Sequence, residues 1–261
     1  PLEQVLAALK GPMTDPKIGK IAHNAKYDYI VLARHGLRVS PLTFDTMLAE
    51  FIIDPASRNF GLKNLAFVKL GEEMTYIEEL IGKGKKQITM AEVAIESAAP
   101  YAAADAEVTL RLLPIQQQEL GRVNGEKLLY EIDLPLTPVL ADMEMTGIAL
   151  DLPFFKETGA RLEKRLAEIE KQVYEAVGKP FNINSTQQLS DVLFNRLGLE
   201  PPDRGNKTAS GHYSTSAGVL ELLRGNHPVV DWVLEHRELS KLKSTYVDAL
   251  QEALNSETGC V

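Results

Sequence analysis

Two pairs of side chains in this sequence are spaced so that they could act together in binding metal ions. In "HNAKYDYIVL", residues 23–32, Asn24 and Asp28 lie four positions apart at the start of an apolar segment. Tyr101 and Asp105 repeat this spacing in "YAAADAEVTL". Residues four apart project from one helix face about one turn apart. Each pair alone also fits helix capping and core hydrogen bonds, so their joint occurrence is the more specific signal.

Aspartates arranged in this way suit hydrolysis of a phosphodiester by two divalent metal ions. Carboxylate oxygens are preferred ligands of Mg²⁺ and Mn²⁺, and in such sites two ions about 3.5–4 Å apart hold the attacking and leaving oxygens. Asp28 and Asp105 are too few to bind both ions. Asp45 is expected to cap a helix and Glu50 to be solvated, and residues 1–23 contain no D-x-E pattern. The sequence therefore contains half of such a site.

The elements that must position these residues alternate between short strands and helices. A strand in "KIGKIAHN" leads into a helix over 24–35, and the segment 37–55 predicts a strand followed by a helix. Further helices are expected over 61–71 and over about 90–120, the last interrupted near Pro100. This alternation predicts an α/β fold for residues 1–125.

Beyond about residue 130 the pattern is nearly all helical. Asp151 is a typical helix cap, and the apolar residues of 152–177 keep close to heptad spacing, which predicts pairing with a helix over 228–254. Ala176, Leu242 and Tyr246 are among the residues expected in that interface. The intervening segment 178–227 is rich in Asn, Ser, Thr and Gly and predicts a polar, flexible tip.

Composition restricts the class of protein. Hydrophobic residues at 44% and charged residues at 25% are typical of globular proteins, and 261 residues can form one large domain or two ordinary ones. The single cysteine, Cys260, excludes an internal disulfide and indicates a reducing, cytoplasmic compartment. No apolar run is long enough to span a membrane. Because the net charge is −8, any DNA-binding surface must be local.

Taken in order, several segments resemble the bacterial DNA polymerases of family A, the polymerase I type. "HNAKYDYIVLARHGLRV", with "FDTMLAEFIIDP", and "YAAADAEVTL" are similar to the second and third motifs of tyrosine-containing DEDD proofreading exonucleases. "EIDLPLTPVLADMEMTGIALD", "FNINSTQQLSDVLF", "YSTSAGVLELL" and "EHRELSKLKSTYVDAL" resemble the polymerase thumb. The resemblance implies a partial RNase H-like exonuclease domain in residues 1–125. It also implies an all-helical thumb in 126–261, with its hairpin at 152–177 and 228–254 and its tip at 178–227.

The resemblance also implies roles for individual residues. Asp28 would bind the looser and Asp105 the tighter of two Mg²⁺ or Mn²⁺ ions, while Tyr101 would orient the attacking water. Asn24 and Tyr27 would line the pocket for a single-stranded 3′ end. The residues that would contact the phosphates of a primer–template duplex are Asn182, Asn184, Ser185, Thr186, Ser214, Thr215, Ser216, Arg237, Lys241 and Ser244. These thumb residues also fit ordinary caps, turns and a solvated basic face.

The implied function is that of part of a DNA-directed DNA polymerase, active in replication and repair, that proofreads by 3′→5′ hydrolysis. The first exonuclease motif would precede Pro1, and the polymerase palm and fingers would follow Val261. The chain alone is therefore expected to be inactive, and only the complete protein would bind dNTPs. The expected location is the bacterial cytoplasm, in association with the nucleoid. Two alternatives stay open: a stand-alone 3′→5′ exonuclease acting on DNA or RNA, and a non-catalytic DNA-binding module.

Overall fold

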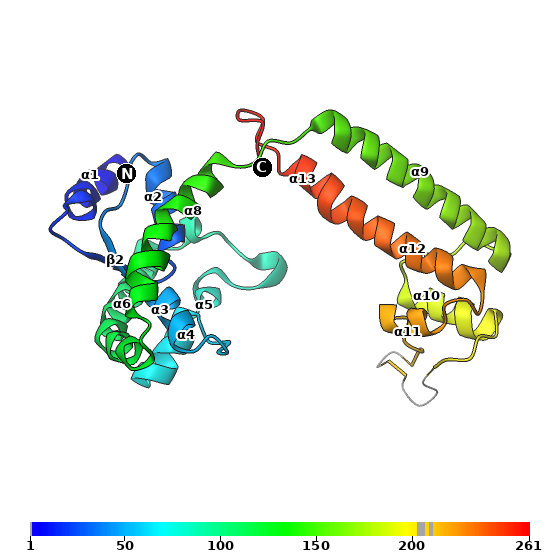
Figure 1. Cartoon of the computed structure of the whole chain (residues 1–261), viewed down its shortest axis with the longest axis horizontal. Helices are drawn as coiled ribbons and strands as arrows, with labels where there is room; N and C mark the ends of the chain where they lie inside the picture. Colours follow the sequence, from blue (N-terminus) through cyan, green and yellow to red (C-terminus); the bar gives the residue numbers. More distant parts are fainter. Residues whose placement is uncertain (1, 203–206, 209–210) are drawn as a thin grey trace. The chain divides into compact units, whose positions relative to one another are not determined.

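The computed structural model describes residues 2–202, 207–208 and 211–261, and the chain divides into two compact units (Figure 1). The first unit is Pro1–Thr146 and the second is Gly147–Val261. This division lies beyond the predicted one at residue 125, because helix α8 (Leu134–Thr146) packs against α2 (Ala25–Arg34) of the first unit. No helix in the described part of the chain is both long and apolar enough to cross a membrane.

The first unit is built around a small parallel sheet. Strand β1 (Lys20–Ala22) pairs with β2 (Leu42–Asp45), so that Ala22 lies opposite Asp45. Helix α2 connects the two strands, and α1 (Leu2–Thr14) precedes them. Parallel strands require a crossover of this kind, usually a helix. The observed arrangement confirms the α/β class predicted for this part of the chain.

The remaining elements of the first unit are helical. They are α3 (Thr46–Ile53), α4 (Leu62–Leu65), the π-helix η1 (Ala66–Leu70), α5 (Ile77–Ile81), the 3₁₀ turns η2 (Gly84–Lys86) and η3 (Met90–Glu92), α6 (Ile95–Val123), α7 (Glu126–Leu128) and the π-helix η4 (Leu129–Asp133). Two small cores lie among them. Phe44, Ala49 and Leu120 belong to one, and Leu65 and Leu112 to the other.

Helix α6 is continuous, so the interruption predicted near Pro100 is wrong. The helix runs from Ile95 to Val123 through both Pro100 and Pro114. A proline inside a helix removes one backbone hydrogen bond and crowds the preceding turn. Here the buried side chains of Leu112 and Leu120 pack into the two cores and stabilise the helix by tertiary contacts.

In the second unit, α9 (Leu152–Val177) lies beside α12 (Pro228–Leu242), which continues into the π-helix η6 (Lys243–Asp248) and α13 (Ala249–Glu252) (Figure 1). The bounds of α9 coincide with the range predicted from the sequence. Ile169 and Val173 of α9 share a core with Val233 of α12. These contacts make a long helical hairpin.

Three residues expected between the paired helices are instead exposed: Ala176, Leu242 and Tyr246. For Tyr246 the reason is the π-helical segment η6, which holds more residues per turn than an α-helix and so changes which residue faces inward. Val247 takes the buried position. It packs closely against α9, since a Cβ added to Gly159 would lie 3.3 Å from a Val247 methyl carbon.

The segment expected to be a polar, flexible tip contains folded elements with a core of their own. They are α10 (Thr186–Ser190), the π-helix η5 (Asp191–Arg196) and α11 (Ala217–Leu222). Leu189, Leu193 and Leu220 are fully buried and extend the core of the helical hairpin. Residues 203–206 and 209–210 of this segment lie outside the described residues, and the described polar residues lie on a folded base.

Candidate functional site

The start of α2 is held by a carboxylate from the neighbouring strand. Asp45 Oδ1 accepts the backbone N–H of Asn24 at 3.2 Å, and its Oδ2 accepts that of Ala25 at 2.7 Å. Asp45 also caps its own helix α3, as predicted, by accepting the N–H groups of Met47 and Leu48. One buried side chain thus caps two helices. Asn24 adopts a left-handed conformation, with φ 60° and ψ 51°, and its side chain makes no capping bond.

Asp28 follows in the first turn of α2 and lines a cavity of about 420 Å³ whose walls are mainly apolar, including Ala22 and Leu32. Removal of water from around the carboxyl raises the pKa of Asp28, and the negative charge of Asp45 raises it further. An uncompensated carboxylate of this kind is suited to an added cation.

Tyr101 and Asp105 lie on α6, which packs against β1 and α3. The charge of Asp105 acts on His23, the residue directly before Asn24. Burial lowers the pKa of His23, and the charges of Asp45 and Asp105 oppose this change. His23 Nδ1 lies 2.9 Å from the Thr46 hydroxyl, so the ring is fixed beside the ends of both strands.

Charges from both predicted motifs act on one place in the fold, the strand-end junction, which we define as His23, Asn24, Asp45 and Thr46. Asp28 is within electrostatic range of Asp45, and Asp105 is within range of His23. The junction lies at the carboxyl ends of two parallel strands, which is where open α/β sheets bind their ligands. Sequence reasoning did not single out His23, although it directly precedes Asn24.

The donor chemistry fits Mg²⁺ or Mn²⁺, whereas the number of donors does not complete a site. Asp28 and Asp105 supply the oxygen ligands that these ions prefer. Among the described residues, no group of three or more His, Cys, Asp or Glu side chains is arranged to hold a metal ion. Two ions need more carboxylates than the described residues bring together here.

The other predicted exonuclease residues differ in their surroundings. Tyr27 is 66% exposed on the outside of α2. The hydroxyl oxygen of Tyr101 lies 3.2 Å from the Nζ atom of Lys63 on α4. No sequence motif pointed to Lys63, because the contact joins elements far apart in the chain. Glu50, which was expected to be solvated, is buried and paired with Lys69 at 2.9 Å, so that expectation is wrong.

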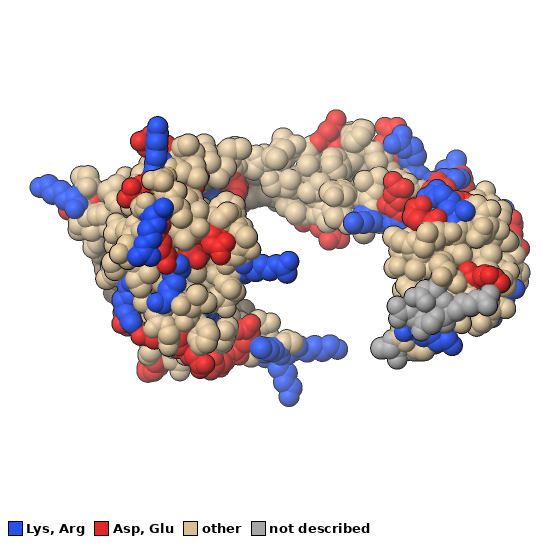
Figure 2. All heavy atoms as spheres, turned by 60° about the horizontal axis from the view of Figure 1, so that its bottom comes forward, with Lys and Arg blue, Asp and Glu red and all other residues tan. Residues whose placement is uncertain are grey.

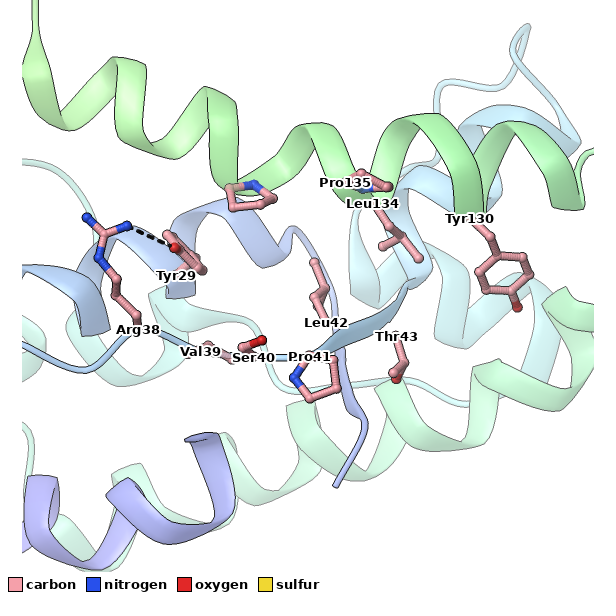
Figure 3. Close-up of a pocket in the computed structure, with 11 residues that line it drawn as sticks. Tyr29, Arg38, Val39, Ser40, Pro41, Leu42, Thr43, Tyr130, Leu134 and Pro135 are labelled. Carbon is pink, nitrogen blue, oxygen red and sulfur yellow. Dashed lines mark hydrogen bonds between the residues drawn. The ribbon is translucent and has the colours of Figure 1, made fainter. Parts of the chain in front are cut away.

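A larger cavity of about 730 Å³ adjoins the one beside Asp28, with which it shares Tyr29, Val39 and Leu42 as lining residues (Figure 3). Its lining comes mainly from the segment 38–43 and from α8, with Tyr29 and Tyr130 adding aromatic surface. Arg38 donates a hydrogen bond to the Tyr29 hydroxyl at 3.4 Å. No carboxylate lines this cavity, which distinguishes it from the cavity beside Asp28.

The first group of predicted thumb residues surrounds the start of α10. Ser185 caps this helix by accepting the N–H of Gln188. The side chain of Asn182 accepts the N–H of Asn184 at 2.9 Å, and Thr186 is exposed in the first turn. Their side chains stabilise local turns and remain close to solvent. This position agrees both with contacts to DNA phosphates and with a role as ordinary helix caps and turns.

The second group divides into buried and exposed members. Thr215 is buried, and the guanidinium of Arg237 donates to both its carbonyl and, at 3.4 Å, its hydroxyl. Burial lowers the pKa of Arg237. The Ser214 hydroxyl accepts the N–H of Ser216 at 3.2 Å. Arg237 is therefore turned toward the tip segment.

Lys241 and Ser244 are exposed on the outer part of the hairpin. The Ser244 hydroxyl contacts the carbonyl of Lys241 at 3.5 Å. Basic and acidic side chains are interspersed over the face shown in Figure 2. A DNA-binding surface on this chain must accordingly depend on a few positions, as its net charge indicates.

Comparison with known families agrees with this division of the chain. Residues 2–120 match the 3′–5′ exonuclease family, and residues 153–261 match DNA polymerase family A. The first match supports the RNase H-like fold expected for the first unit. The two matches follow one another along most of the chain.

Individual relatives of this chain are named DNA polymerase I. DNA polymerase I of Chloroflexus aurantiacus is 48% identical over 99% of this chain, and that of Pseudomonas aeruginosa is 38% identical over 98%. This chain covers 28% of the length of each. A solved structure, the POL domain of Pol1 from M. smegmatis in complex with DNA primer-template and dNTP, is 31% identical with a TM-score of 0.74. The alignment covers 98% of this chain and 40% of that one. This chain belongs to the family A DNA polymerases, with its first 120 residues related to their 3′–5′ exonuclease domain.

Proposed function

We propose that this chain is the part of a bacterial DNA polymerase I that contains most of its proofreading 3′→5′ exonuclease domain and its thumb. The observation that supports the exonuclease assignment is that charges from the two remote motifs, on Asp28 and Asp105, both act on the strand-end junction. Asp28 comes from the helix after β1, and Asp105 comes from α6, which packs on β1. The complete polymerase would copy DNA in the bacterial cytoplasm, near the nucleoid.

In the complete exonuclease site, two Mg²⁺ or Mn²⁺ ions would supply charge stabilisation and an activated water. Asp28 and Asp105 would contribute ligands, and further carboxylates are required beside them. Tyr101 would orient the water through its hydroxyl. Asn24, whose side chain makes no capping hydrogen bond to α2, would contact the nucleotide at the single-stranded 3′ end together with Tyr27.

The second unit would bind the primer–template duplex. The solved relative with DNA supports this assignment by its likeness over almost the whole chain. Exposed Lys241, Ser244 and Thr186 are the best placed of the predicted residues to reach phosphates, whereas Thr215 is buried. Binding of dNTPs would belong to the complete polymerase.

Manganese binding to the isotope-labelled chain tests the exonuclease assignment. Mn²⁺ is paramagnetic and broadens nearby amide resonances, so substoichiometric ion should broaden signals around both Asp28 and Asp105. Asp28→Asn and Asp105→Asn should each weaken the effect at both places, because the two ions of the proposed site would lie only about 3.5–4 Å apart and the loss of either ligand would disturb both. Asp142→Asn, an exposed aspartate of the same unit paired with Arg38, is the matched control. Broadening at only one of the two places would contradict the shared site.

A non-catalytic DNA-binding role for this chain is the second candidate, and one observation favours it. The described residues contain no group of three or more side chains arranged to hold a metal ion. Incubation of the chain with labelled single-stranded DNA and Mg²⁺ or Mn²⁺ separates the two candidates, because trimming from the 3′ end would exclude the binding-only role. A stand-alone exonuclease is disfavoured by the match of residues 153–261 to the polymerase family.

A further inference from the structure

Lys63 on helix α4 lies beside Tyr101, a residue of the proposed exonuclease site. Its Nζ atom lies 3.2 Å from the Tyr101 hydroxyl oxygen and 4.4 Å from the centre of the Tyr101 ring. The centre of the Tyr76 ring lies 5.6 Å from the same Nζ atom, and the ammonium also donates to the carbonyl of Thr75. The cation is thus held in place by two aromatic rings and a carbonyl oxygen.

These contacts fix the ammonium without neutralising it. Among the described residues, Lys63 has no carboxylate within ion-pair distance. Lys69 on the adjoining η1 provides the contrast, since it is paired with Glu50 at 2.9 Å and Glu119 at 2.5 Å. A half-buried lysine with its full charge unpaired is suited to an anionic ligand.

The contact also determines what the Tyr101 hydroxyl can do. An ammonium group can only donate hydrogen bonds, so Lys63 uses the oxygen of Tyr101 as an acceptor. The hydroxyl hydrogen of Tyr101 is then available for a second partner. Lys63 and Tyr101 together present one positive charge and one hydroxyl donor, a combination that fits a phosphate oxygen.

We propose that Lys63 is a substrate-binding residue of this site: its ammonium binds a phosphate oxygen at the single-stranded 3′ end and keeps Tyr101 oriented as a donor. This inference rests on the proposed exonuclease function and adds a residue to it. The alternative is that Lys63 has a purely structural role and only joins α4 to α6. A structural lysine would contribute to stability and leave the salt dependence of DNA binding unchanged.

The test measures binding of a 5′-fluorescein-labelled oligothymidylate to the full 261-residue chain, in EDTA, at several salt concentrations. Each phosphate contact to a single strand contributes about 0.7 to the slope of log affinity against log salt. Lys63→Met should lower the slope by about that amount and weaken binding roughly tenfold at low salt. Lys63→Arg should preserve the slope because it keeps the charge.

Lys127→Met is the matched control, since it removes the same charge from an exposed helix of the same unit and should leave the slope at the wild-type value. Lys63→Gln is a second neutral variant that keeps a polar donor, and circular dichroism verifies the fold of each. An unchanged slope in a folded Lys63→Met or Lys63→Gln chain overturns the inference. If the exonuclease proposal itself fails, the Mn²⁺ response of Asp28 and Asp105 is absent, whereas failure of the inference alone leaves that response intact.

Discussion

Asp45 and Ala25 are joined by a 2.7 Å hydrogen bond in which the strand-end carboxylate accepts the first backbone N–H of helix α2. The same carboxylate caps α3, so one side chain fixes the start of the helix that carries Asp28 and the start of the next helix. This relationship depends on strand pairing, because Ala22 and Asp45 are register partners in the sheet. Helix capping and strand pairing thus both help to position Asp28, a proposed metal ligand.

We expect Asp45→Ala to destabilise the first unit by about 1–4 kcal/mol, because two helix caps of about 0.5–2 kcal/mol each are lost. Urea unfolding followed by circular dichroism measures the change. Trp232, the single tryptophan, reports on the second unit, so its fluorescence transition should stay in place. Asp151→Ala removes a single exposed cap from α9 and should show the opposite pattern, shifting the Trp232 signal instead. Equal shifts of both signals by Asp45→Ala would contradict the local role.

Lys69→Met should destabilise the first unit by roughly 3–5 kcal/mol, because Glu50 would remain buried without its cation. Burial alone lowers the pKa of Lys69, but hydrogen bonds and charges of Glu119 and Glu50 outweigh it and raise the pKa. A raised folded pKa means that this stabilisation is complete below the unfolded value, about 10.4, and is lost only as pH rises through the folded value. Urea unfolding at pH 7 and at pH 11 measures both effects. Lys127→Met, a control on the surface, should change stability little.

The sequence contained enough local information to predict several elements. Asp45 as a cap, the bounds of α9 and the helix after β1 all follow from short-range patterns of caps and apolar spacing. The second capping role of Asp45 could not be foreseen, since it depends on the register of two strands that are separated by a helix. Local sequence patterns do not specify which residues of two distant strands pair with each other.

Tertiary contacts also explain why the burial of Glu50 and the position of Lys63 could not be predicted from the sequence. Glu50 reads as a surface residue because its partners, Lys69 and Gln116, come from elements far along the chain. Lys63 carries no motif, and its place beside Tyr101 follows from the packing of α4 on α6. The types of the proposed ligands were visible in the sequence, whereas their supporting contacts were not.

Asp28→Asn should raise the melting temperature of the first unit at pH 7. The pKa of Asp28 is raised in the folded state, so its ionised form opposes folding; this cost is absent below the unfolded pKa, about 4, and grows as pH rises through the folded value. The variant should therefore have no effect at pH 3. Glu72→Gln is the control of opposite sign, because hydrogen bonding to Arg111 lowers the pKa of Glu72. Thermal melts at the two pH values measure the difference, and a destabilised Asp28→Asn chain at pH 7 would refute this account.

Arg237→Lys should loosen the tip segment while keeping the charge. The guanidinium donates to both the carbonyl and the hydroxyl of Thr215, and a lysine cannot reproduce this forked geometry. We expect amide exchange over residues 212–216 to accelerate about tenfold, the equivalent of one hydrogen bond to a charged group. Hydrogen–deuterium exchange with mass spectrometry measures the effect. Unchanged exchange would mean that the Arg237 contact does not hold the segment.

Lys241→Ala should affect duplex DNA binding without affecting the fold, because the side chain is exposed and forms no ion pair among the described residues. Loss of one phosphate contact lowers the slope of log affinity against log salt by about 0.9 for duplex DNA. Fluorescence anisotropy with a labelled primer–template at several salt concentrations measures this slope. Lys171→Ala, which removes an exposed lysine from α9, is the matched control and should retain the wild-type slope. The same slope in both variants would remove Lys241 from the proposed DNA-binding surface and leave Ser244 and the segments around α10 and α11 as its remaining candidates.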